Sequence, residues 1–242
     1  MIKNKKIFLD INNKLINNII PQVDLHTHTN WTDGKNTVKE MYNEACKKKL
    51  DIILFSEHAR STSDSWFKKF ASEVKSLRVK NCKPLVGAEV KILNYKGEID
   101  INKKIIKECD YIMGSVHRFP GEDGINTKKT ISKYSKKEAI EIEFELSIAA
   151  LKYSSIDILG HPFGMSYSRY KTEPSWKMIN ELILTAKKYN KAFEINSHYH
   201  KYAKKMIKDC IKSGTLISLG SNAHSIKELG QIQKLLKKNE KN

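Results

Sequence analysis

Short apolar runs alternate along this sequence with longer amphipathic stretches rich in lysine, and this alternation limits the folds available to it. The apolar runs are too short for helices and rich in β-branched residues, so we predict that they are buried strands. Strands that alternate with helices imply a parallel sheet with helical crossovers. The seven predicted strands therefore favour a closed or nearly closed α/β barrel, with an open doubly wound sheet as the alternative. They are residues 23–25, 51–55, 84–90, 111–116, 156–159, 192–195 and 216–219.

Helices are expected in the amphipathic stretches, because their apolar residues recur at helical spacing. The length of 242 residues, without a linker rich in Pro, Gly or Ser, predicts a single domain over residues 1–242, with residues 1–20 as an N-terminal extension. Residues 118–135 are the least regular stretch and are expected to form an active-site loop or lid. The predicted helices are residues 37–49, 65–79, 103–108, 136–152, 175–189, 199–213 and 225–238.

The formal net charge of +17 comes almost entirely from lysines spread through every predicted helix. Such a surplus permits a nucleic acid partner, but grooves that bind nucleic acid use more arginine and clustered aromatic residues, so this partner is not favoured. The four cysteines form no CxxC pair, which is typical of reduced thiols. Since no signal peptide and no apolar run of the ~20 residues of a membrane span is evident, we expect a cytoplasmic protein with no membrane partner.

Six of the eight histidines follow predicted strands, at the end where parallel α/β folds carry their active sites. Neutral imidazole binds zinc, iron and manganese, and carboxylates complete or bridge such sites. In the segment from His26 to His28 the two rings are two residues apart, so on an extended strand they point to the same side. Asp33, Glu57 and Glu89 lie at the same edge. The pattern predicts a metal centre. The six histidines are His26, His28, His58, His117, His161 and His224.

The motifs around these histidines resemble those of the PHP (polymerase and histidinol phosphatase) family, in the family's order. The resemblance spans residues 22–225 and implies a distorted (β/α)7 barrel and a metal-dependent hydrolase. The matching segments are Asp24-Leu25-His26-Thr27-His28-Thr29 with Asp33, Ser56-Glu57-His58, Gly87-Ala88-Glu89, Gly114-Ser115-Val116-His117, Ile158-Leu159-Gly160-His161-Pro162 and Ser221-Asn222-Ala223-His224.

The resemblance also implies two or three divalent metal ions (zinc, manganese or iron) at neighbouring sites. The family normally has aspartate where this chain has Asn222, so this chain lacks one negative charge there and the first site is expected to bind its ion more weakly. The first ligand set is His26, His28, Glu89 and Asn222, the second is Glu89, His117 and His161, and the third is Asp33, His58 and His224.

Such a centre predicts hydrolysis of a phosphate ester, because clustered metal ions can generate a hydroxide from water and neutralise the phosphoryl oxygens. We expect Glu89 and His117 to act in catalysis, together with Arg118 and Arg169, whose planar guanidinium groups suit phosphate. The expected substrate-binding residues are Arg60, Asn196 and His198.

Three functions remain open at this point. The leading prediction is a phosphatase acting on a small-molecule phosphate monoester, similar to histidinol phosphatase. The second is a phosphodiesterase or nuclease acting on nucleotides or DNA ends, which the net charge permits. The third is a non-catalytic binding module, for which Asn222 is the supporting feature.

Overall fold

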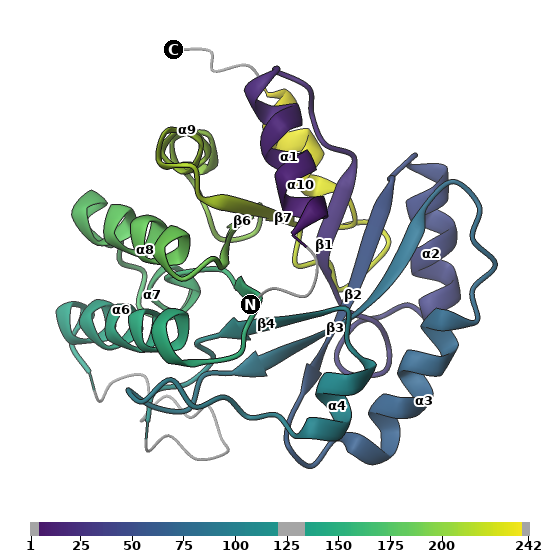
Figure 1. Ribbon diagram of the computed structural model, residues 1–242, viewed down its shortest axis with the longest axis horizontal. Coiled ribbons are helices and arrows are strands. Elements are labelled where there is room, and N and C mark those ends of the chain that lie inside the picture. Colours follow the sequence, from purple (N-terminus) through teal and green to yellow (C-terminus); the bar gives the residue numbers. More distant parts are fainter. Residues whose placement is uncertain (1–4, 121–133, 239–242) are drawn as a thin grey trace.

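A parallel seven-stranded sheet that curves into a barrel forms the centre of the computed structural model, which describes residues 5–120 and 134–238 (Figure 1). The strands follow one another around the sheet in chain order. The barrel predicted from the strand pattern is therefore confirmed, and the open doubly wound sheet is wrong. The strands are β1 (Val23–Thr27), β2 (Ile52–Ala59), β3 (Lys83–Lys91), β4 (Tyr111–Ser115), β5 (Ile158–Leu159), β6 (Ala192–Asn196) and β7 (Leu216–Gly220).

The barrel closes between β1 and the segment that follows β7. His28 N–H donates to the carbonyl oxygen of Ala223 (2.8 Å), and Ala223 N–H donates to that of His26 (3.2 Å). The buried carboxylate of Asp24 accepts a further hydrogen bond from Ser221 N–H (2.9 Å). This closure brings the carboxyl end of the first strand beside that of the last, although about 190 residues separate them in sequence.

Helices surround the strands (Figure 1). Each predicted helix is confirmed, although the last begins at Gln231, after Gly230 in the left-handed region (φ 72°), and not near Ser225. The helices are α1 (Lys6–Ile16), α2 (Val38–Lys47), α3 (Asp64–Lys75), α4 (Lys103–Glu108), α6 (Lys136–Tyr153), α7 (Gly164–Ser168), α8 (Trp176–Lys188), α9 (Ala203–Ser213) and α10 (Gln231–Lys237).

The N-terminal segment packs against the barrel. It contains α1, whose Phe8 and Ile11 are fully buried. Phe8 packs edge-on against Tyr111 at the start of β4. The Asn12 amide accepts a hydrogen bond from Ile217 N–H (3.0 Å) on β7. Helix α1 therefore covers the amino ends of the strands, opposite the end where the histidines lie.

The segment predicted as a loop or lid, residues 118–135, lies mostly outside the described residues. None of the helices in the two described ranges combines the length and the apolar character needed to cross a membrane.

Candidate metal centre

A single buried carboxylate occupies the middle of the histidine cluster at the carboxyl ends of the strands. Glu89, on β3, is 1% exposed and faces imidazole nitrogens from four other segments of the barrel. Neutral imidazole and carboxylate are the groups that bind zinc, iron and manganese in proteins, so this arrangement suits divalent cations held between the rings and Glu89. The Glu89 oxygens lie 2.8 Å from His161 Nε2, 3.0 Å from His58 Nδ1, 3.1 Å from His117 Nε2, 3.4 Å from His26 Nε2 and 3.5 Å from His28 Nε2.

A second carboxylate, Asp33, stands at the exposed edge of the cluster. Its oxygens lie 3.4 Å from His58 Nε2 and 3.3 Å from His224 Nε2. The other nitrogen of His224, Nδ1, is 2.9 Å from the Asn222 carbonyl oxygen. Since a carbonyl oxygen can only accept, Nδ1 carries the proton, and the Nε2 lone pair of His224 is free to bind an ion.

Glu57 lies at this edge, as the sequence suggested, but its carboxylate faces a loop and not the ligand cluster. It is fully buried and accepts hydrogen bonds from Thr29 N–H (2.7 Å), the Thr29 hydroxyl (2.7 Å) and the Thr32 hydroxyl. Burial raises the pKa of Glu57 to about 7, against the effect of these hydrogen bonds. These bonds hold the turn that carries Asp33.

Behind the cluster, Glu194 on β6 supports two of the candidate ligands. One of its oxygens is 2.8 Å from His26 Nδ1 and accepts a hydrogen bond from the Asn196 amide (2.8 Å), and the other accepts from His161 N–H. Because Glu194 holds the proton of His26 on Nδ1, Nε2 faces the cluster with its lone pair. A Cβ on Gly220 would clash with Glu194 Oε1 and His26 Cβ, so this close approach requires glycine.

The turn after β5 is strained and is held by a buried histidine. His161 and Phe163 both have positive φ, at 23° and 63°, values that non-glycine residues rarely adopt. His200 Nδ1 accepts a hydrogen bond from Asn196 N–H (3.0 Å), so its Nε2 is protonated and donates to the Pro162 carbonyl oxygen (3.0 Å). Burial lowers the pKa of His200 to about 4. This neutral histidine stabilises the turn that presents His161.

The two neighbouring residues predicted to bind substrate have different environments. Asn196 is fully buried. Its side-chain NH₂ donates to Glu194, and its Oδ1 accepts a hydrogen bond from His198 N–H (2.9 Å). Both polar groups of Asn196 are therefore used within the structure that supports the cluster. His198 is exposed, and its ring packs edge-on against Tyr199. Tyr199 in turn contacts the ring of His161, which places His198 at the rim of the centre.

The pKa values of the two buried rings on β1 shift in opposite directions. Burial, with the neighbouring rings of His58 and His26, holds the pKa of His28 well below its usual value. For His26, burial is outweighed by the carboxylates of Glu194 and Glu89, which hold its pKa well above its usual value. Divalent cations can take the place of protons among such ligands, because metal binding requires neutral imidazole.

The ligand-capable atoms fall into three groups, within each of which all atoms lie within 4.8 Å of one another. The predicted third set recurs with His28 added, whereas His117 and His161, predicted in one set, belong to different groups. Within the described ranges, the buried Nδ1 atoms of His28 and His161 have no hydrogen-bond partner. This donor set fits divalent cations. The groups are His28, Asp33, His58 and His224; His26, Glu89 and His161; and His58, Glu89 and His117.

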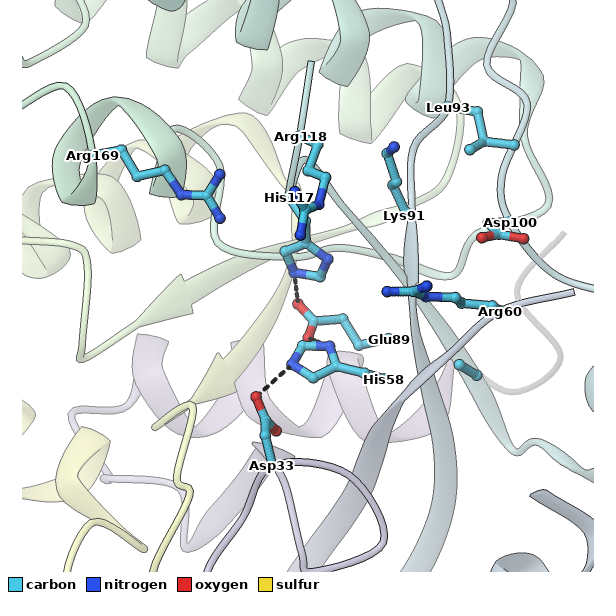
Figure 2. Close-up of a pocket in the computed structure, with 11 residues that line it drawn as sticks. Asp33, His58, Arg60, Glu89, Lys91, Leu93, Asp100, His117, Arg118 and Arg169 are labelled. Atoms are coloured by element: carbon cyan, nitrogen blue, oxygen red, sulfur yellow. Dashed lines mark hydrogen bonds and ion pairs between the residues drawn. The ribbon is translucent and has the colours of Figure 1, made fainter. Parts of the chain in front are cut away.

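A pocket of about 550 Å³ opens beside Glu89, His58 and His117. Figure 2 shows cationic side chains reaching into it from several elements. They are Arg60, Lys91, Arg118 and Arg169. The acidic side chains that line it are Asp33, Glu89 and Asp100.

One of these cations is presented by a short helix that the sequence did not predict. Arg169 follows α7, whose first turn is held by the buried carboxylate of Glu143 on α6. This carboxylate accepts hydrogen bonds from Met165 N–H (3.0 Å) and Ser166 N–H (2.8 Å). Glu143 thereby fixes the start of the helix that leads to Arg169.

Two residues of the site were not expected from the sequence: Glu194, which supports the ligands, and Lys91, which lines the pocket. The signal for Glu194 was an acidic residue inside an otherwise apolar run, and for Lys91 its position two residues after Glu89 on one strand. Residues two apart on a strand point to the same side, so Lys91 could have been expected beside the centre.

The PHP domain family model matches residues 24–198 of the chain, which is more than half of it. The chain belongs to the PHP domain family. A relative in Caldicellulosiruptor bescii, named as a probable phosphatase, is 28% identical to this PHP protein over 224 residues, which are 88% of this chain and 83% of the relative. These findings support the prediction of a hydrolase of the phosphatase class.

Two solved structures share the fold of this PHP protein. HisK from Listeria monocytogenes has a TM-score of 0.68 at 16% identity and matches 86% of this chain and 97% of its own. The histidinol phosphate phosphatase of Lactococcus lactis, complexed with zinc, L-histidinol and phosphate, has a TM-score of 0.62 at 17% identity, with coverages of 89% and 93%. The likeness confirms the distorted (β/α)7 barrel of the PHP type.

We expect Asn222→Asp to tighten metal binding in this PHP protein on the order of tenfold, because a charged oxygen would replace a neutral one. Asn222 Oδ1 lies 3.2 Å from His28 Nε2, and the residue has φ 52°, which aspartate also tolerates. Metal titration of the metal-depleted protein measures the change, with Asn222→Ser as the uncharged control. Equal or lower affinity in the aspartate variant would contradict the expectation.

Proposed function

We propose that this protein is a metal-dependent phosphatase that hydrolyses a phosphate monoester of a small metabolite. The observation that carries the proposal is the Glu89 carboxylate, faced by five imidazole nitrogens at the floor of a pocket whose walls are cationic. The zinc and phosphate bound by the Lactococcus lactis neighbour support this assignment. The pocket volume of about 550 Å³ also suits a small molecule.

The proposed ligands are the predicted ones, and they would hold two or three ions of zinc, manganese or iron. When bound, these ions would lower the pKa of water and neutralise charge on the phosphoryl oxygens. Glu89 and His117 border both the ligand groups and the pocket, so they would set where the phosphoryl group lies. The ligands are His26, His28, Asp33, His58, Glu89, His117, His161, Asn222 and His224.

The side chains of Arg118 and Arg169 are proposed to bind the phosphoryl oxygens. Both line the pocket beside His117, and a guanidinium group can donate two parallel hydrogen bonds to phosphate. Arg60 lines the same pocket and is proposed to contact another part of the substrate. His198, at the rim, is a further proposed substrate contact.

The test is elemental analysis of protein purified without chelators, combined with hydrolysis of a panel of metabolite phosphates that includes histidinol phosphate. His117→Ala serves as the control for contaminating phosphatases. A single-stranded oligonucleotide in the panel tests the alternative nuclease, which would show activity that falls steeply with salt. Protein that holds no metal and cleaves no ester would contradict the proposal and favour a binding module.

We expect Arg118→Ala and Arg169→Ala each to raise the KM for a phosphate monoester by about 10-fold or more, because each removes charge-assisted hydrogen bonds worth roughly 1.5–3 kcal/mol. Metal content should not change, since neither arginine belongs to a ligand group. Steady-state kinetics and elemental analysis measure both quantities. Unchanged kinetics in both variants would show that the phosphate is bound elsewhere.

A further inference from the structure

Two of the pocket cations, Arg60 and Lys91, lie at the carboxyl ends of β2 and β3, whereas the arginines assigned to the scissile phosphate follow β4 and α7. We propose that they form a second anion-binding subsite, and that the substrate carries a second phosphate or a carboxylate besides the phosphate that is cleaved. This inference rests on the proposed function, since it names the substrate class of the same pocket.

The strand register places these two cations side by side. The parallel pairing of β2 with β3 sets His58 opposite Glu89. The pairing ends with Ala59 opposite Val90, and the next residues along the two segments are Arg60, directly after β2, and Lys91, the last residue of β3. Residues two apart on a strand share a face and are separated by roughly 6.6 Å. Arg60 and Lys91 therefore form a cationic row above the row of metal ligands, and both line the pocket.

The described residues leave the charges of this row largely unbalanced. In the described ranges, neither Lys91 Nζ nor the Arg60 guanidinium has an ion-pair partner, and Lys91 is partly buried. Adjacent like charges on neighbouring strands are destabilising. The acidic residue that lines the pocket near this row is Asp100, and one of its oxygens already accepts hydrogen bonds from Ser61 N–H (2.9 Å) and the Ser61 hydroxyl (2.7 Å). The other two described acidic residues of the pocket, Asp33 and Glu89, belong to the metal centre, so Asp100 alone offsets the two charges of the row.

This surplus of positive charge favours a substrate with a second anionic group. In Figure 2, Arg60 and Lys91 lie on one side of His117 and Arg169 lies on the other, with Arg118 between Lys91 and Arg169. A substrate whose organic part carries an amine would bring a cation towards Arg60 and Lys91. A phosphate or carboxylate placed roughly 7 Å from the scissile phosphoryl group would instead receive charge-assisted hydrogen bonds from both.

The test compares phosphate esters that differ in one group. Glycerol phosphate and fructose monophosphate carry a single anionic group, whereas phosphoglycerate adds a carboxylate and fructose bisphosphate adds a phosphate. Phosphoethanolamine supplies the amine. We expect kcat/KM to be at least about tenfold higher for the esters with two anionic groups than for their partners with one. The better of phosphoglycerate and fructose bisphosphate identifies the second group as carboxylate or phosphate.

Lys91→Gln tests whether this preference arises at the subsite. We expect the ratio of kcat/KM between paired esters to fall about tenfold in this variant, as one charge-assisted contact is lost. Lys83→Gln is the matched control, because it removes the same charge at the opposite end of the same strand, where the side chain is exposed. Equal ratios in Lys91→Gln and the wild type, or a preference for phosphoethanolamine that Asp100→Asn removes, would overturn the proposal.

Calorimetric binding of phosphoglycerate and glycerol phosphate to the metal-loaded protein separates this inference from the proposed function. If no ester is hydrolysed but phosphoglycerate still binds more tightly in a Lys91-dependent way, the subsite stands and the phosphatase assignment fails. If esters are hydrolysed without any preference for a second anionic group, the phosphatase stands and the subsite fails.

Discussion

Glu89→Gln is expected to reduce phosphatase activity by about 10³-fold or more, because metal ions contribute several kcal/mol of transition-state stabilisation and this carboxylate is shared by the ligand groups. Its oxygens lie within 3.5 Å of five imidazole nitrogens. Glutamine has no negative charge and presents an NH₂ group where one oxygen stood. Two of the three ligand groups include Glu89, so both should lose affinity together.

Elemental analysis after dialysis and kcat with the best ester of the panel measure this effect. Glu143→Gln is a matched control, because Glu143 is an equally buried carboxylate outside every ligand group. The control should retain its metal content, while Glu89→Gln should not. A Glu89→Gln protein that keeps the metal content and more than about a tenth of the activity of the wild type would exclude Glu89 as the shared ligand.

Glu194→Gln is expected to lower metal affinity by about 10–100-fold, although Glu194 belongs to none of the ligand groups. Glu194 is fully buried, and its two oxygens receive hydrogen bonds from the His26 ring, the Asn196 amide and His161 N–H. Glutamine would turn an NH₂ group towards at least one of these donors. The orientation and basicity of His26 would then no longer be held by a carboxylate.

Competition with a chelator of known affinity measures the metal dissociation constant, and thermal unfolding of the metal-free protein measures the structural cost. A merely structural role would lower the melting temperature of the metal-free protein without changing metal affinity. Glu143→Gln is again the comparison, since it should affect stability and leave metal affinity unchanged. If both variants have the same metal affinity as the wild type, Glu194 does not position the ligands.

The strands and the histidines at their ends were predictable because both are local patterns. A buried parallel strand has a short apolar run as its sequence, and the carboxyl ends of parallel strands meet at one edge of the sheet irrespective of the loops between them. His117 and His161 could therefore be placed together from their positions after β4 and β5 alone. The resemblance to PHP motifs added Asn222 and the assignment of Asp33, already expected at this edge, to a ligand set.

Helix α1 could not be placed from the sequence, because its lysine and asparagine residues hide the buried Phe8 and Ile11. Its position depends on contacts with strands far along the chain, such as the hydrogen bond between Asn12 and Ile217. The same holds for Glu194. From the sequence, a carboxylate inside an apolar run is as consistent with an ion pair as with a support for metal ligands. Only the positions of the neighbouring strands show which groups it contacts.

By itself, the sequence determined the alternation of parallel strands with helices, the edge at which the histidines gather, and the residue types available to bind metal, because hydrophobic periodicity is a property of neighbouring residues. Closure of the sheet into a barrel, as opposed to an open doubly wound sheet, was decided by the tertiary structure. Only the tertiary structure decided which imidazoles surround Glu89 and which carboxylates lie among the ligands or support them from behind. It also decided that Arg60 lies beside Lys91. These depend on barrel closure and on register between strands, and a shift of one residue in register would turn each side chain to the opposite face.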